Sequence, residues 1–195
     1  LARYRRRQEK FLEYQRGLEE LKSLPAQTQD GHQVRLYANI EYPEEIKQAL
    51  KFGAEGIGLY RTEFLYDEQH PDPSEEDHYV AYSRAIELLG DRPLVIRTLD
   101  LGADKFRPDG LEEEPNPFLG CRSIRYCLME RQDVFIRQLR AILRVSTRGD
   151  VRIMLPMISS LEELQLAKSV IEEVKNDLRS EGNTIRADIS AGIMI

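Results

Sequence analysis

Short apolar runs alternate with amphipathic segments along most of the chain. Five runs are nearly continuous in apolar residues, as expected of strands covered on both faces: VRLYANI, GIGLYRTEF, LVIRTLDLG, RIMLPM and SAGIMI. The segments between them carry apolar residues at helical spacing. Because parallel strands must be joined by a crossover, usually a helix, the pattern predicts a parallel β/α fold with about five strands.

Capping signals predict where the first of these helices begin and end. Pro43 takes the favoured first helical position before EEIKQAL, and Gly53 follows as a C-cap. Ser74 and Asp77 form a capping box for a second helix, which stops at Gly90.

Two further helical regions follow. We expect helical material over about 121–147, and then a helix capped by Ser159 with Glu162. The apolar face of the latter comprises Leu161, Leu164, Ala167, Ile171, Val174 and Leu178.

The first 24 residues predict a helix of a different kind, because its apolar stripe is narrow and surrounded by charge. The stripe comprises Phe11, Tyr14, Leu18 and Leu21. This pattern favours an arm or interdomain helix over a core element. We therefore expect a linker helix over 1–28 and a β/α domain over 29–195.

Periodicity leaves two architectures open. Five parallel strands suit a doubly wound, flavodoxin-like sheet or part of an eight-stranded barrel, and strand order distinguishes them. The chain also ends in an apolar strand, SAGIMI. Domains rarely stop inside a buried strand, so we expect a truncated barrel. Such a piece could instead act as an interaction module through its uncovered strand edges.

Composition narrows the classes of function. The chain has 195 residues and a net charge of −6, and an acidic protein is a poor candidate for general nucleic-acid binding. No apolar run approaches the length of a membrane helix, and the basic start LARYRRRQEK lacks the apolar core of a signal peptide. We expect a soluble, cytoplasmic protein in which Cys121 and Cys127 are free thiols.

Two arginines carry the main chemical signal. Arg61 and Arg97 each stand where an apolar strand turns polar, and each is followed by Thr. Substrates of β/α folds bind at this end of the strands. Two guanidinium groups at one rim repel each other unless an anion lies between them, and phosphate fits the planar fork of arginine. The alternative is internal salt bridges: Arg61 with Glu63 or Asp100, and Arg97 with Asp100 or Asp104.

Other polar residues give weaker signals. Lys105 and Arg122 could add positive charge to the same rim, although each taken singly reads as a surface charge. His32, His70 and His78 lie in turns or at a helix start without metal-like neighbours, and we interpret them as solvated.

Five segments together resemble a known family. GAEGIGLYRTEFLY, VIRTLDLGADK, NPFLGCRSIR, RIMLPM and GIMI occur in the order and at the spacings of the C-terminal domain of the Enzyme I family of the bacterial phosphotransferase system. The resemblance implies an eight-stranded β/α barrel that binds phosphoenolpyruvate (PEP) and Mg²⁺ at its carboxyl rim. Arg61 and Arg97 match PEP-binding arginines of that family, while Arg122 and Lys105 match basic residues near the same site.

The resemblance also implies a reaction for a longer parent protein. The phosphoryl group would pass from PEP to a histidine in a separate N-terminal domain and then to the carrier protein HPr during sugar uptake, in a homodimer. The metal-binding glutamate would directly follow Ile195, with a metal-binding aspartate and a catalytic cysteine further on. Cys121, Cys127 and the three histidines therefore inherit no catalytic role, and we expect the fragment alone to be inactive.

Related barrels remain as alternatives. Pyruvate phosphate dikinase and PEP synthase share the barrel, but their segment matching RTLDLGADK differs. A nitrogen-regulatory paralogue of Enzyme I differs mainly in an extra N-terminal domain, which this chain does not reveal.

Overall fold

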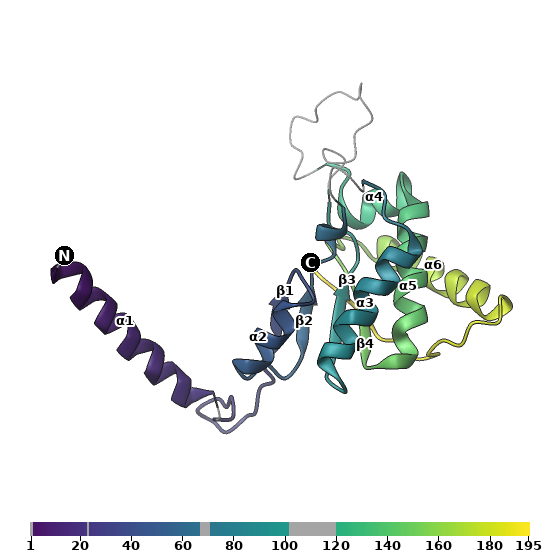
Figure 1. Ribbon diagram of the computed structural model, residues 1–195. Helices are drawn as coiled ribbons and strands as arrows, with labels where there is room; N and C mark the ends of the chain where they lie inside the picture. The colour runs from purple at the N-terminus through teal and green to yellow at the C-terminus, as the bar shows by residue number, and fades with distance from the viewer. Residues whose placement is uncertain (1, 23, 67–70, 102–119) are drawn as a thin grey trace.

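The computed structural model describes residues 2–22, 24–66, 71–101 and 120–195 (Figure 1). Helices alternate with short strands after an N-terminal helix. The elements are α1 Ala2–Leu21, β1 Ala38–Ile40, α2 Glu45–Lys51, β2 Ile57–Tyr60, the 3-10 helix η1 Glu63–Leu65, α3 Glu75–Leu89, β3 Leu94–Arg97, α4 Ser123–Met129, α5 Gln132–Val145, the 3-10 helix η2 Ser146–Arg148, β4 Val151–Leu155, α6 Leu161–Ser180 and β5 Ala191–Ile193.

The described strands form one parallel sheet in the order β1-β2-β3-β4-β5. Each strand therefore pairs with its neighbours in sequence. A doubly wound sheet reverses its strand order near the middle, and this one does not. The barrel prediction is confirmed in the form of a partial TIM-like barrel, and the flavodoxin-like alternative is wrong.

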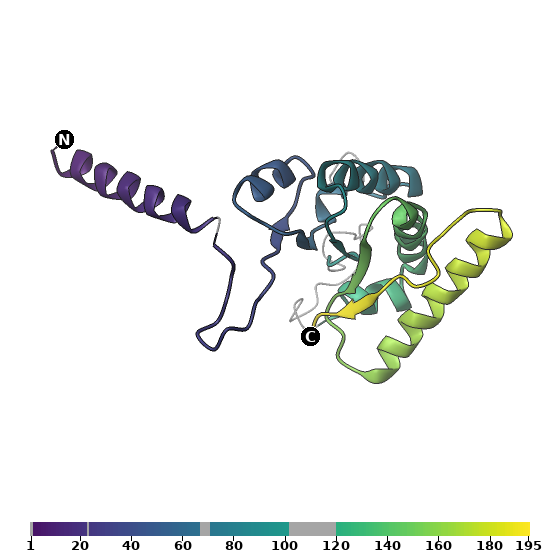
Figure 2. The ribbon, with the colours of Figure 1, turned by 90° about the horizontal axis from the view of Figure 1, so that it is seen from below.

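The helices α2, α3, α5 and α6 lie around the outside of the curved sheet (Figure 2). In the central strands β3 and β4, the residues that face the helices are buried, as Leu94 and Ile96 of β3 illustrate, whereas all residues of β5 are exposed. Residues on the other face, such as Val95 and Arg97, are only half-buried. The core therefore lies between the helices and the central strands, and the concave face is the inside of an open barrel.

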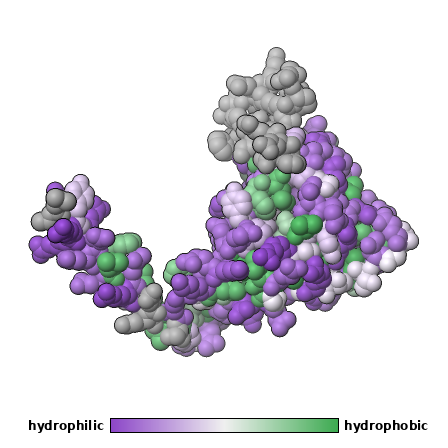
Figure 3. Space-filling model, viewed as in Figure 1, coloured by the Kyte–Doolittle hydropathy of each residue, from purple (hydrophilic) through white to green (hydrophobic). Residues whose placement is uncertain are grey.

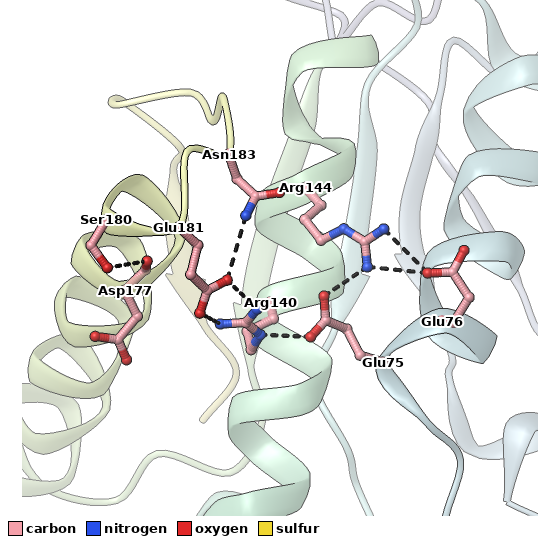
Figure 4. A network of polar contacts seen from close by, with 8 residues as sticks. All are labelled: Glu75, Glu76, Arg140, Arg144, Asp177, Ser180, Glu181 and Asn183. Carbon is pink, nitrogen blue, oxygen red and sulfur yellow. Dashed lines mark hydrogen bonds and ion pairs between the residues drawn. The ribbon is translucent and has the colours of Figure 1, made fainter.

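An ion network joins the outer helices. The Arg140 guanidinium of α5 lies 2.6 Å from Glu75 of α3 and 2.7 Å from Glu181 at the end of α6. Arg144, one turn further along α5, contacts Glu75 at 2.7 Å and Glu76 at 3.2 Å (Figure 4). The network fixes three helices relative to one another behind the sheet.

Helix α1 extends away from the barrel as an arm (Figures 1 and 2). Its predicted apolar stripe is exposed, with Phe11 and Tyr14 among the residues open to solvent. Figure 3 shows a few hydrophobic positions among mostly hydrophilic ones along the arm. The helix prediction is confirmed, and the proposed boundary near residue 28 stays a prediction.

Most predicted helix boundaries hold within two residues. The capping box of Ser74 and Asp77 is present, and Gly90 ends α3 with a positive φ of 62°. Helix α2 begins at Glu45, two residues after the position predicted from Pro43. Ser160, not Ser159, caps α6 by accepting from the backbone of Glu163.

One expectation about the helical segments was wrong, the assignment of Leu161 to the apolar face of α6. The helical material expected over about 121–147 is present as two α-helices, because Arg131 between them is non-helical (φ −129°, ψ 56°). The Arg131 guanidinium forms ion pairs with Asp133 and with Asp72, which is distant in sequence, and the latter contact favours the interruption of the helix at Arg131. No Gly or Pro in the sequence signals this interruption. Leu161, assigned to the apolar face of α6, is 63% exposed.

None of the described helices is both long and apolar enough to span a membrane.

Candidate functional site

Arg61 and Arg97 lie at the same edge of the sheet. Tyr60 of β2 and Ile96 of β3 are register partners, so the next residues, Arg61 and Arg97, follow at neighbouring strand ends. Tyr60 and Ile96 are fully buried on the helix side. Side chains alternate along a strand, which directs both arginines to the concave side of the carboxyl rim.

The threonine after each arginine fastens the strand end to the next strand. Thr62 donates to the Arg97 carbonyl oxygen at 3.1 Å, and Thr98 donates to that of Met154 at 3.5 Å. Both threonines are fully buried. The repeated Arg-Thr pair therefore combines a rim cation with a buried anchor.

Two carboxylates, those of Glu63 and Asp100, bind the Arg97 guanidinium. Its Nη1 lies 2.9 Å from Asp100 Oδ2, and its Nη2 donates to Glu63 Oε1 at 3.2 Å. Glu63 Oε1 also accepts from the backbone N–H of Asp100 at 3.1 Å. The expected salt bridge between Arg97 and Asp100 is present, with Glu63 as an additional partner, while Asp104 lies outside the described residues. The Arg97 side chain is only 12% exposed.

Arg61 is the opposite case. It is exposed and makes no ion pair with any residue that the structure describes, so the alternative pairing with Glu63 or Asp100 is wrong. Arg61 acts electrostatically on Glu45, whose pKa is lowered first by hydrogen bonds from the backbone N–H groups of Tyr42 and Glu41 and to a lesser extent by the charge of Arg61. The rim thus presents one fixed guanidinium beside one that is open to an incoming anion.

Arg122 joins the same cluster through Asp100. Its Nη2 lies 3.5 Å from Asp100 Oδ1, and the Ser123 hydroxyl donates to that oxygen too. Ser123 has a φ of +53°, a left-handed conformation that costs a non-glycine residue about 1 kcal/mol or more. Bonds from its N–H to the Leu101 carbonyl and from its hydroxyl to Asp100 hold this strained turn, which orients Arg122 toward the rim. Lys105 lies outside the described residues.

A buried hydrogen-bond network supports the rim from behind. Gln138 of α5 accepts from the Leu99 N–H at 2.9 Å and donates to the hydroxyls of Thr62 and Tyr82 at 2.9 and 3.0 Å. Tyr82 in turn bonds His78 Nδ1 at 2.9 Å. The sequence analysis missed Gln138, although a lone amide within the apolar face of a helix was a signal.

The interpretation of His78 as solvated was wrong. Its ring is fully buried, with Nε2 3.2 Å from the Tyr66 hydroxyl and Nδ1 bonded to Tyr82. Burial, assisted by the nearby Arg137, lowers the pKa of His78 to about 4, so the ring is neutral. His32 is exposed as expected, and His70 lies outside the described residues.

The cysteines are both free thiols. Burial raises the pKa of Cys127 to about 12, so its thiol does not ionise near neutral pH and is a poor nucleophile. Among the described residues, no group of three or more His, Cys, Asp or Glu side chains could hold a metal ion.

Comparison of the sequence with known proteins identifies its family. The family described as PEP-utilising enzyme, PEP-binding domain, matches residues 15–195. The chain is 43% identical, over its whole length, to a phosphoenolpyruvate-protein phosphotransferase of Staphylococcus carnosus (strain TM300), and covers 34% of that protein.

Two more relatives carry the same name. The chain is 47% identical to the phosphotransferase of Priestia megaterium over 85% of its length, and 48% identical to that of Geobacillus stearothermophilus over 86%. It spans 29% of each of these proteins, and so about a third of the length of the curated relatives it matches. The chain belongs to the family of PEP-utilising enzymes, with residues 15–195 matching their PEP-binding domain.

Proposed function

We propose that Arg61 and Arg97 bind the phosphoryl group of PEP, and that the full-length protein transfers this group to one of its own histidines and then to HPr. Arg122 and Lys105 add positive charge to the same site. The protein would be a cytoplasmic homodimer that serves sugar uptake; a role in the nitrogen-regulatory branch is the alternative. The phosphotransferase relatives support the reaction class.

One observation carries the proposal for the site. Arg61 and Arg97 directly follow two residues that pair across adjacent strands. Among the described carboxylates, Glu63 and Asp100 neutralise Arg97, and none neutralises Arg61. The unneutralised charge of Arg61 at a barrel rim favours an anionic guest.

The two arginines suit different parts of phosphoryl transfer. The reaction demands positioning and stabilisation of negative charge on the equatorial phosphoryl oxygens. Arg97, fixed by Glu63 and Asp100, is a preorganised donor that need not reorient when charge develops. Arg61 is free to close on the phosphate and to complete the clamp.

Magnesium does not fit the described rim by itself. Glu63 and Asp100 already accept from Arg97, and Asp100 also from Ser123. Both oxygens of Asp100 and Oε1 of Glu63 are engaged in these bonds, and the described residues hold no group of three or more acidic, His or Cys side chains that could supply the several ligands Mg²⁺ needs. The family resemblance assigns the metal ligands to later residues, and no step proposed for this chain passes through the metal.

Calorimetric titration of the full-length protein tests the proposal. We expect PEP to bind, pyruvate to bind far more weakly because it lacks the phosphoryl group, and inorganic phosphate to compete with PEP. Pyruvate binding as tightly as PEP would show that no phosphate clamp exists. Transfer of phosphate from PEP by residues 1–195 alone would contradict the expectation that this piece is inactive.

Self-association is a second candidate function. The described sheet leaves one edge of β1 and one of β5 without a strand partner, and Ile193 of β5 is 43% exposed. Uncovered strand edges favour pairing with another chain. Light scattering of residues 1–195 should give a mass above 22.6 kDa, and a monodisperse monomer would contradict this candidate.

A further inference from the structure

We propose that Gln138 is a positioning residue for the arginine clamp: its buried amide fixes the spacing between the Arg61 and Arg97 segments. The inference rests on the proposed function and concerns a residue that lies behind the site, where it touches no ligand. Gln138 is fully buried in the middle of α5. Its neighbours one turn away on the same face of the helix are buried and apolar: Val134, Phe135, Ala141 and Ile142.

The amide orientation of Gln138 is set by the backbone. The Leu99 N–H can only donate, and it bonds the side-chain oxygen of Gln138. The nitrogen of Gln138 must then face the hydroxyls of Thr62 and Tyr82 and donates one proton to each. Thr62 is left with its own proton, which it donates to the Arg97 carbonyl.

These bonds connect both arginine-bearing segments to one side chain. Thr62 directly follows Arg61, while Leu99 lies two residues after Arg97. A single buried amide therefore joins the exit of β2 to the exit of β3, in addition to the bond from Thr62 to Arg97. Misplacement of a binding group by about 1 Å can reduce the rate or affinity strongly, so such a connection matters for a two-point clamp.

The hydrogen bonds on the Tyr82 side of the network make the Gln138 amide hard to replace by another side chain. Tyr82 accepts from Gln138 and can donate to His78 Nδ1, and His78 Nε2 faces Tyr66. Loss of Gln138 would leave the Leu99 N–H in the core without its partner and would remove one hydrogen bond from each hydroxyl, although Thr62 keeps the Arg97 carbonyl and Tyr82 keeps His78. The strand exits would relax to satisfy these groups, and the spacing of the arginines would change with them.

Substitutions in the full-length protein separate positioning from general stability. Gln138→Met keeps the size of the side chain but removes its hydrogen bonds. Thr62→Val likewise keeps the size of Thr62, the hydrogen-bond partner of Gln138, and removes its hydroxyl. We expect each to weaken PEP binding about tenfold in calorimetry well below the melting temperature. Thr62→Ser should recover most of the affinity. The double variant should lose less than the two single losses combined, because both remove one shared bond.

Val145→Ala is the matched control, since Val145 is buried at the far end of α5, away from the rim. It should lower the melting temperature but leave PEP affinity unchanged. Unchanged PEP affinity in both Gln138→Met and Thr62→Val, or an equal loss in Val145→Ala, overturns the inference. A wild-type protein that binds no PEP overturns the proposed function itself, which is a distinct outcome.

Discussion

Arg61 and Arg97 follow register partners at the carboxyl edge of the sheet, yet only Arg97 is held by described carboxylates. This difference in ion pairing indicates that the two arginines have different roles. Arg97 belongs to the folded framework of the rim, whereas Arg61 contributes a charge that the framework does not use. Substitutions at the two positions should therefore have different effects on stability.

For Arg61→Ala we expect a change of less than about 0.5 kcal/mol in the free energy of unfolding, because an exposed residue without an ion pair is lost. PEP affinity should fall roughly 10- to 100-fold, the cost of a charged hydrogen-bonding partner. Chemical denaturation and calorimetry on the same preparation measure both. A stable variant with unchanged affinity would remove Arg61 from the site.

For Arg97→Met we expect losses of both stability and affinity. The substitution leaves Glu63, which is 16% exposed, without its cation and leaves Asp100 only the longer ion pair with Arg122, at a cost of about 2–4 kcal/mol. Adding Glu63→Gln should recover part of the stability, since the uncompensated charge of Glu63 disappears, but should not restore PEP binding. Recovery of binding in that double variant would mean that Arg97 serves only as a counter-ion.

The neutral His78 predicts a stability that falls in mild acid. Its folded pKa of about 4 lies below the ordinary value of 6.5, so the unfolded chain binds the proton more readily. The contribution is absent above pH 6.5 and destabilises increasingly as the pH falls toward 4. Between pH 7.5 and 5 it amounts to about 2 kcal/mol.

Comparison with His78→Gln isolates this effect from other acid-sensitive groups, including Asp72 and Asp77, which act on His78 electrostatically. Denaturation of both proteins at several pH values gives the difference. The gap in stability between them should narrow as the pH falls. Parallel pH profiles would show that the His78 ring titrates normally.

The positions of Arg61 and Arg97 at the strand ends could be predicted from the sequence. Arg61 and Arg97 stand where apolar runs become polar, and parallel topology brings such positions to one edge. Their partners depend on folding in three dimensions. Glu63 reaches Arg97 from 34 positions away, and Gln138 reaches Thr62 from 76 positions away. Local patterns contain no information about contacts at such separations.

The same limit explains the errors in the elements. His78 resembles a helix-start residue exposed to water, and only the packing of Tyr66 and Tyr82 around it makes it a core residue. The run VRLYANI predicts seven strand residues, but only Ala38–Ile40 are in the strand. The preceding Leu36 instead exchanges hydrogen bonds with Glu55.

Arg140→Met should affect stability alone. Its guanidinium joins Glu75 and Glu181 behind the sheet and is 22% exposed, so we expect a loss of about 1–2 kcal/mol without a change in PEP affinity. Arg148→Met is the matched control, because the pair of Arg148 and Glu87 is more exposed and should contribute less. Thermal denaturation and calorimetry test both variants, and reduced PEP binding in Arg140→Met would link the network to the site.

A crystal structure of the full-length protein with bound PEP measures the central relationship most directly. We predict that phosphoryl oxygens lie about 2.7–3.2 Å from guanidinium nitrogens of both Arg61 and Arg97, with Glu63 and Asp100 still bonded to Arg97. A phosphoryl group bound elsewhere, with either arginine beyond hydrogen-bonding distance, would contradict the two-arginine clamp.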